Sequence, residues 1–194
     1  MELLLYVALG FGAQLIDGTL GMAYGVSSNT FLRTIARLPS VVSSACVHFS
    51  ELFTTLVSGL SHLKLRNVSK ALFFKLLVPG IVGGSLGAYL LVAFSSTAVD
   101  LVIDCYLVVM GVVIFLKAFK KPSRPKEYGN YAYALGFAGG LTDAMGGGGW
   151  GPIVTSTLLA SGHDTRKTIG TVNAAEFFVT LAETTTFAAL VVDF

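Results

Sequence analysis

Residues 143–152 read Asp-Ala-Met-Gly-Gly-Gly-Gly-Trp-Gly-Pro, in the middle of an apolar segment that runs from Tyr131 to Ala160. A bilayer-crossing helix needs roughly 20 mostly apolar residues, so this segment is too long for one crossing. Consecutive glycines followed by a proline interrupt helical winding near its centre. The sequence therefore predicts two half-length helices around an unwound centre. That centre must face protein or water, because lipid cannot pair free N–H and C=O groups.

A second interruption, Asp17-Gly-Thr-Leu-Gly-Met-Ala-Tyr-Gly25, divides the apolar segment from Met1 to Leu32. Shifting the chain by 126 positions places Gly10, Phe11, Leu15, Asp17, Gly21 and Gly25 on Gly136, Phe137, Leu141, Asp143, Gly147 and Gly151. A shift of 125 then places Glu51 on Glu176. We interpret these matches as an internal repeat. Gly-interrupted segments at corresponding positions of two repeats are typical of secondary transporters, whose substrate site lies between the halves.

The composition excludes several protein classes. Of the 194 residues 54% are hydrophobic and 12% charged, and the mean hydropathy is +0.75, which excludes an ordinary soluble enzyme. A net charge of +2 without a basic face excludes a nucleic-acid-binding protein. Cys46 and Cys105 both lie in apolar stretches and give neither a disulfide framework nor a metal-ligand cluster. The remaining class is a polytopic membrane protein.

Four more membrane spans are predicted from the hydropathy: Val41–Leu63, Leu76–Val99, Leu101–Leu116 and Thr168–Val192. In the second of these, Gly80 with Gly84 and Gly83 with Gly87 form overlapping small-xxx-small patterns, which let a neighbouring backbone approach closely. The predicted fold is therefore an all-α transmembrane helical bundle with an internal repeat and two Gly-broken segments.

The basic residues indicate the orientation. Nine of the thirteen lie in two loops, as Lys64, Arg66, Lys70, Lys75, Lys117, Lys120, Lys121, Arg124 and Lys126, and we expect both loops to be cytoplasmic. If the broken segments are simple crossings, the two halves are parallel; if they are re-entrant hairpins, the halves are inverted. We prefer hairpins, because they place Arg166 and Lys167 on the side of the other basic loops and leave only Arg33 and Arg37 outside.

The repeat divides the chain into 1–118, a first transmembrane repeat, 119–130, a basic cytoplasmic linker, and 131–194, a second repeat that stops early. The first half continues from Lys70 to Ala118 with two more spans, whose equivalents would follow Phe194. We therefore expect either a piece of a longer protein or a homo-oligomer in which two copies complete the architecture.

Carboxyl groups are predicted at membrane depth. Glu51 lies near the middle of its span, with His48 and Thr55 on the same helix face. The second half repeats this stripe as Asn173, Glu176, Thr180 and Glu183. A charged side chain at this depth costs at least roughly 2.5 to 3.5 kcal/mol on insertion scales, so a cavity, a partner or a proton must compensate. Two roles remain open for Glu51 and Glu176: proton coupling, or a neutral hydrogen-bonded carboxyl that holds its own repeat.

The second break has the features of an anion site. Consecutive glycines let backbone N–H groups converge, and the half-helix after Pro152 points its positive end to the same place. The candidate substrate-binding residues are Gly146, Gly147, Gly148, Gly149, Trp150, Gly151, Thr155, Gly21, Tyr24, Gly25, Ser28 and Asn173. For Asp17 and Asp143 we favour capping of the following half-helix over substrate binding. A flexible kink is the alternative to a site. No catalytic residue, metal ligand or cofactor is predicted.

Two segments of the second half carry a family resemblance: Gly136-Phe-Ala-Gly-Gly-Leu-Thr-Asp-Ala-Met-Gly-Gly-Gly-Gly-Trp-Gly-Pro152 and Lys167-Thr-Ile-Gly-Thr-Val-Asn-Ala-Ala-Glu-Phe-Phe178. Together they resemble the sulfite exporter TauE/SafE family, also called the toluene-sulfonate uptake permeases. Ala45-Cys-Val-His-Phe-Ser-Glu51 is similar to one branch of it. The resemblance implies two four-span halves and a multi-pass permease of the plasma membrane, in a bacterium the inner membrane. Its substrates would be sulfite, sulfonates or related small organosulfur anions, moved with an ion gradient.

The first half departs from the family pattern. Met22-Ala-Tyr replaces the glycine run, and Val26 stands where the second half has Pro152. The second break would then bind the substrate while the first shapes the pathway. The expected partners are a small anion and the lipid bilayer. The alternatives are a passive anion channel and an intramembrane enzyme, which would need a nucleophile and base that His48 and Ser50, on different helix faces, do not form.

Overall fold

The protein is all-helical. The computed structural model describes residues 2–20, 23–94, 96–118 and 129–191, and no strand occurs in these ranges. The elements are α1 (Glu2–Leu20), α2 (Tyr24–Thr34), α3 (Ser40–Lys64), α4 (Lys70–Ala93), α5 (Thr97–Ala118), α6 (Tyr131–Gly146), the π-helical turn η1 (Gly151–Thr155), α7 (Ser156–Ala160) and α8 (Thr165–Val191). The predicted all-α class is confirmed.

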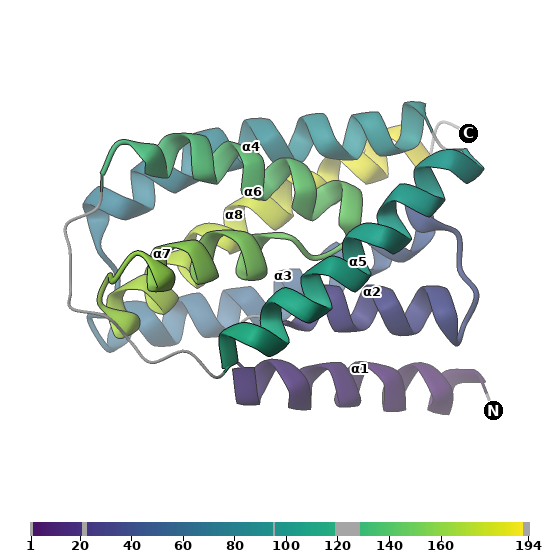
Figure 1. Cartoon of the computed structure of the whole chain (residues 1–194), viewed down its shortest axis with the longest axis horizontal. Helices are drawn as coiled ribbons and strands as arrows, with labels where there is room; N and C mark the ends of the chain where they lie inside the picture. The colour runs from purple at the N-terminus through teal and green to yellow at the C-terminus, as the bar shows by residue number, and fades with distance from the viewer. Residues whose placement is uncertain (1, 21–22, 95, 119–128, 192–194) are drawn as a thin grey trace.

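Both broken segments are re-entrant hairpins. In Figure 1, α1 runs leftward from the right end of the bundle and α2 returns to the right, whereas α6 enters from the left end and η1 and α7 return to the left. The long helices that follow them, α3 and α8, also run in opposite directions. The two halves are therefore related by inversion, as expected from the preferred interpretation of the charges.

The helix bounds correct one predicted span. Helix α3 agrees with Val41–Leu63 within one residue at each end, but α4 begins six residues before Leu76 and ends six residues before Val99. The charged residues Lys70 and Lys75 do not prevent helix formation, because a long lysine side chain can carry its ammonium group to the helix end. Lys75 Nζ indeed reaches the Gly129 carbonyl oxygen at 3.4 Å.

The glycines of α4 bring it against α6. A Cβ atom on Gly83 would overlap the carbonyl oxygen of Phe137, and one on Gly140 would overlap that of Gly80. Gly87 meets the Leu141 carbonyl oxygen in the same way. The small-xxx-small prediction is therefore confirmed, because the two backbones pack at a distance that no other residue type allows.

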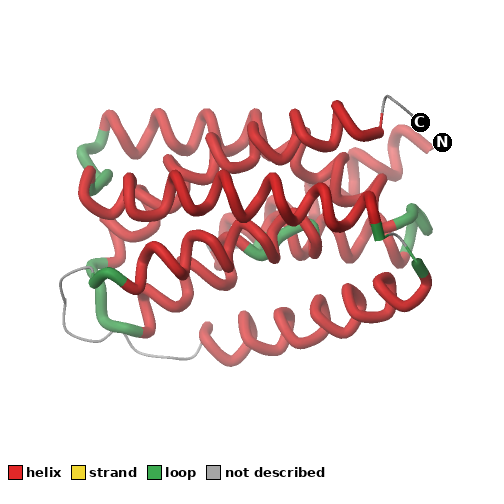
Figure 2. The backbone as a smooth tube through the Cα atoms, turned by 90° about the horizontal axis from the view of Figure 1, so that it is seen from above, coloured by secondary structure: helices red, strands yellow, loops and turns green. Residues whose placement is uncertain are grey.

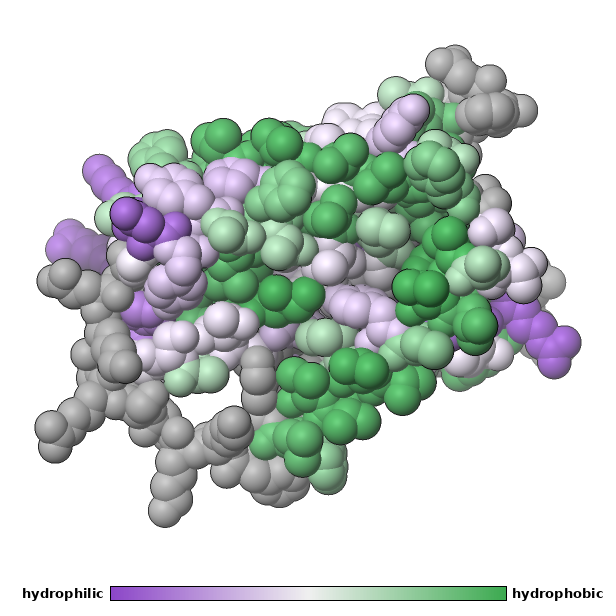
Figure 3. Space-filling model, turned by 45° about the horizontal axis from the view of Figure 1, so that its top comes forward, coloured by the Kyte–Doolittle hydropathy of each residue, from purple (hydrophilic) through white to green (hydrophobic). Residues whose placement is uncertain are grey.

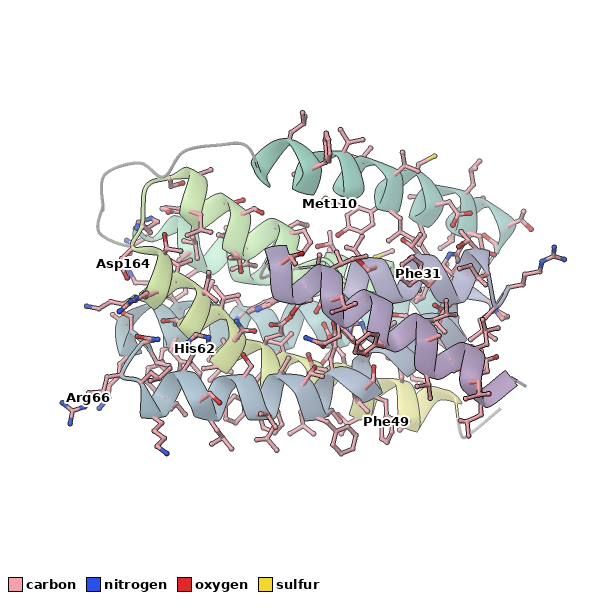
Figure 4. All side chains as sticks on the ribbon, turned by 90° about the horizontal axis from the view of Figure 1, so that it is seen from below. Phe31, Phe49, His62, Arg66, Met110 and Asp164 are labelled. Carbon is pink, nitrogen blue, oxygen red and sulfur yellow. The ribbon has the colours of Figure 1, made fainter. Side chains whose placement is uncertain are left out.

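The exterior is apolar around the middle and polar at the two ends. Figure 3 shows hydrophobic residues across the centre of one face and strongly hydrophilic residues at both ends of the long axis. Phe49 points outward from α3, whereas Arg66 and Asp164 both lie at one end of the bundle, on different elements (Figure 4). Two described helices, α3 and α4, are long and apolar enough to cross a bilayer. An exterior of this kind suits a lipid environment.

The break between α6 and η1 lies inside the bundle. Figure 2 shows a non-helical segment in the interior, away from the connections at the two ends. Gly147, Gly148, Gly149 and Trp150 are all buried. Unwound backbone is thus enclosed by protein, as its unpaired polar groups require.

Candidate functional site

The tips of the two hairpins touch. A Cβ atom on Gly25 would lie 2.5 Å from the Cα of Gly148 and 2.8 Å from Glu51 Oε1. Gly147 has φ of 63° and Gly148 of 148°, values that favour glycine. These two residues turn the chain back at the end of α6 and let it approach Gly25. The centres of the two breaks, distant in sequence, therefore meet inside the bundle.

An aspartate organises each break. Asp17 Oδ1 accepts hydrogen bonds from the backbone N–H of Ala23 at 2.8 Å and of Tyr24 at 3.1 Å. In the second half, Asp143 Oδ1 accepts one from the Trp150 N–H at 2.9 Å. Each carboxylate thus pairs amides at the start of the returning helix, which would otherwise have no acceptor. This is the contact expected of a capping aspartate.

The aspartates also occupy donors that were expected to hold an anion. Besides the Trp150 N–H, which bonds the Asp143 carboxyl group, the Gly148 N–H bonds the Asp143 carbonyl oxygen at 3.2 Å. Two of the amide groups at this break are therefore already paired within the protein. Side-chain hydroxyl and amide groups become the main candidates.

A cavity of about 120 Å³ lies where the hairpins meet α3 and α8. Its lining includes residues that the sequence predicts for the site and several more hydroxyl and amide side chains. The lining residues are Gln14, Asp17, Tyr24, Gly25, Glu51, Thr54, Thr55, Ser58, Asp143, Gly148, Gly151, Pro152, Thr155, Asn173 and Glu176. A space of this size holds a few water molecules or one small polar ion.

Other predicted site residues lie outside the lining. Trp150 is completely buried in the core, packed against Gly80 and Val179, with its indole N–H bonded to the Val172 carbonyl oxygen at 3.2 Å. The remaining predicted residues that the cavity does not reach are Gly146, Gly147, Gly149, Ser28 and His48. Gly21 lies outside the described residues. Trp150 does not line the cavity, because the backbone turn at the glycines directs its large ring away from the hairpin tips and toward α4.

Asn29 joins the two hairpins, although it is not among the predicted site residues. Its Nδ2 donates to the Gly146 carbonyl oxygen at 2.5 Å, and its Oδ1 accepts from the Ser43 hydroxyl. Only 1% of Asn29 is exposed. The amide group thus fixes the end of α6 to α2 and α3. Asn29 stands in a run of polar residues, Ser27-Ser-Asn-Thr30, in a segment expected at membrane depth, and such a run is a signal that could have indicated a contact between helices.

We expect Asn29→Ala to lower the free energy of unfolding by roughly 2 to 3 kcal/mol, because it leaves the buried Gly146 carbonyl and Ser43 hydroxyl groups without their partner. Thermal unfolding of the detergent-solubilised protein, followed by Trp150 fluorescence, measures the change. Asn130→Ala, at an exposed asparagine, is the matched control. Equal melting temperatures for the two variants would show that the Asn29 contacts contribute little.

Four carboxyl groups line the cavity, from Asp17, Glu51, Asp143 and Glu176, and no Lys, Arg or His is among its lining residues. Glu51 and Glu176 occupy equivalent positions in the two halves, so the inversion brings both to one space. With all four ionised the cavity would be strongly negative. Two unit charges 4 Å apart repel by about 4 kcal/mol at an effective dielectric constant of 20. Protons are therefore expected on some of these groups.

A fifth carboxyl group lies behind the cavity. Glu183 is completely buried, and its Oε2 is 3.2 Å from His48 Nδ1, which is also 3.1 Å from Glu51 Oε2. The sequence places Glu183 on the face of Glu176 but gives no reason to single it out. Its proximity to His48 depends on how α3 packs against α8.

The sequence is similar to those of known proteins. The family model described as sulfite exporter TauE/SafE matches residues 6–194. The chain is 37% identical over 193 residues to the probable membrane transporter protein YtnM of Bacillus subtilis (strain 168), a match that covers 96% of this chain and 64% of that protein. The chain thus spans less than two thirds of the length of this relative. No solved structure matches.

Proposed function

Because the chain belongs to the sulfite exporter TauE/SafE family, we propose that it is a multi-pass permease of the plasma membrane that carries a small sulfur oxyanion or sulfonate together with protons. The observation that carries this proposal is the cavity between the two hairpin tips, which both halves line with carboxyl, hydroxyl and amide groups. A substrate site at the meeting point of broken helices, between inverted halves, is typical of secondary transporters that work by alternating access.

The hydroxyl and amide groups of the cavity are the substrate ligands in this proposal. These groups come from both halves of the chain: Thr54, Thr55 and Ser58 from the first, and Thr155 and Asn173 from the second. Neutral donors can pair the oxygens of sulfite or a sulfonate without an opposite charge. Asn173 keeps one N–H beyond its bond to the Ile169 carbonyl oxygen, whereas Thr54 and Thr55 would first have to give up their bonds to the Glu51 carbonyl oxygen. Gly151 lies among them at the start of η1, where helix N–H groups favour an anion.

Protonation of the carboxyl groups lowers the electrostatic cost of placing an anion in this cavity. Glu51 and Glu176 line the cavity. Unlike Asp17 and Asp143, they do not bond the described backbone amides of the breaks. They are therefore the proposed proton carriers. Once both are neutral, the repulsion that an incoming anion meets is reduced by several kcal/mol. Substrate and protons then enter and leave together, which couples the flux to a pH gradient.

The ends of the bundle indicate the sidedness. Arg66 lies at the end where α6 begins, together with the loop that joins α3 to α4. Arg33, in the last turn of α2, and Arg37, between α2 and α3, lie at the other end. By the bias of Lys and Arg toward the cytoplasmic side, the end with Arg66 is the cytoplasmic one.

We expect Glu176→Gln to reduce proton-driven uptake of radiolabelled sulfite into proteoliposomes by at least about tenfold, because the glutamine keeps the shape but cannot carry a proton. Asp164→Asn, which removes an exposed carboxyl group at the basic end, is the matched control. Sulfite flux that is indifferent to Glu176→Gln and to the pH gradient would remove the coupling role. Flux that never saturates with sulfite would indicate a passive channel instead.

A further inference from the structure

Behind the cavity three helices bring together His48 of α3, Asp143 of α6 and Glu183 of α8. The imidazole and the Glu183 carboxyl are completely buried, and Asp143 is 1% exposed. One ligand atom of each residue lies within 4.8 Å of the other two. Asp143 Oδ2 and Glu183 Oε1 have no hydrogen-bond partner among the described residues, and Glu183 Oε2 is close to His48 Nδ1, at 3.2 Å. Unpaired acceptors at such burial indicate that a positively charged species belongs between them.

One carboxyl oxygen of Asp143 lies within 4.8 Å of one of Glu183. Two ionised carboxylates this close together inside a protein repel strongly, and such pairs do not both ionise. With Glu51 included, three carboxyl groups surround a single imidazole. Even a positively charged His48 would leave this group with a net charge of −2, which costs several kcal/mol per uncompensated ion. At least one carboxyl group must therefore carry a proton.

The contacts of His48 favour a proton over a metal ion. Its Nδ1 lies 3.1 Å from Glu51 Oε2 and 3.2 Å from Glu183 Oε2, which are hydrogen-bond and ion-pair distances to two acceptors. A metal-ligating histidine normally donates its other ring N–H to a partner. The other nitrogen of His48, Nε2, has no such partner among the described residues. One nitrogen between two carboxyl oxygens is instead the arrangement of a proton relay.

We infer that Glu183 stores a proton behind the cavity and that His48 exchanges this proton with Glu51. The proton leaves the Glu51 carboxyl for the lone pair of Nδ1, giving a carboxylate and an imidazolium. The same nitrogen then gives it to the Glu183 carboxylate, which becomes the neutral acid and restores the imidazole. Glu51 lines the cavity and Glu183 does not, so the relay connects the substrate space to a closed store. The role of this relay in transport rests on the proposed function, whereas the presence of a stored proton on Glu183 does not depend on it.

Other titratable groups besides His48 and Glu51 surround Glu183. The titratable groups that face this cluster from the elements around it are Asp17 on α1, Tyr106 on α5, Asp143 on α6 and Glu176 on α8. On α4 the contact is Gly84, where a Cβ atom would lie 2.5 Å from Glu183 Oε1. The missing side chain at Gly84 leaves the space that the Glu183 carboxyl occupies. The relay also crosses from α3 of the first half to α8 of the second, so a movement of the halves would make or break it.

Infrared difference spectroscopy of the purified protein, titrated with pH, tests the store without any substrate. We expect a protonated-carboxyl band that is absent from Glu183→Gln, remains in Asp164→Asn, and titrates at a midpoint shifted by about one pH unit or more in His48→Gln. If Glu183→Gln does not fold, Glu183→Asp provides the same test, because a shorter carboxyl must shift the band. A band unaffected by changes at Glu183, or by His48→Gln, would overturn the proposal.

Metal analysis of the same samples tests the competing occupant. A divalent metal bound at one equivalent in the wild type and lost in Glu183→Gln would also overturn the proposal.

Transport measurements separate this inference from the proposed function. In proteoliposomes we expect Glu183→Gln to keep at least half of the sulfite exchange seen without a gradient, but to lose at least about tenfold in accumulation driven by a pH gradient. Loss of both by the same factor would contradict a relay role. If the wild type carries no sulfite but shows the Glu183 band with its dependence on His48, the proton store is supported and only the proposed substrate is contradicted.

Discussion

Gly148→Ala should abolish sulfite uptake into proteoliposomes, leaving less than about a tenth of the wild-type rate. At φ of 148° a side chain is strained by roughly 1 to 3 kcal/mol. Its Cβ atom would also overlap the backbone of Gly25 and Val26, which cannot turn aside as a side chain could. The hairpin tips must then separate, and the cavity that both of them line loses its shape.

Gly18→Ala is the control for this substitution. It lies in α1, and a Cβ atom there meets nothing within 4 Å. Alanine favours a helix over glycine by up to about 1 kcal/mol, so stability should be equal or slightly higher. Uptake and the melting temperature should both stay near the wild-type values. If Gly148→Ala behaved like Gly18→Ala, close contact of the tips would not be needed for transport.

Gly83→Leu should prevent stable assembly of the bundle, with a loss of at least about 3 kcal/mol in the free energy of unfolding. Gly83 faces the main chain of Phe137 and Leu141 on α6, so a larger residue must push the helices apart. In lipid, helix association depends on such close packing, because the hydrophobic effect does not drive it. The expected readout is aggregation or early elution in size-exclusion chromatography.

Gly111→Leu tests whether the effect of Gly83→Leu is local. Gly111 lies in α5 and is exposed, and a Cβ atom there would meet nothing within 4 Å. The leucine should be accepted at this position with an unchanged elution profile. An equal loss in both variants would mean that leucine insertion itself, and not the contact of α4 with α6, is responsible.

The sequence predicts the residues of the cavity better than those of the core around it. The repeat pairs Asp17 with Asp143 and Glu51 with Glu176, and all four residues line one cavity. The inverted arrangement explains this result, because equivalent positions of inverted halves meet near the shared centre. Trp150 was misplaced because a glycine run does not reveal to which side the next ring turns.

Two residues needed the tertiary structure. Asn29 bonds the Gly146 carbonyl oxygen, and Glu183 approaches His48, across helices that are far apart in sequence. Neither contact has a local pattern, since each depends on the rotation of one helix relative to another. A buried polar residue in an apolar helix indicates that some partner exists, but not which one.

The sequence by itself determined an all-helical chain with two interruptions, because apolar length and runs of glycine act locally on backbone hydrogen bonding. Only the tertiary structure decided that both interruptions are hairpins whose tips touch, and that one imidazole lies between carboxyl groups of the two halves. Those features follow from close helix packing, which glycines permit at many positions and which steric fit among all the helices restricts to one arrangement.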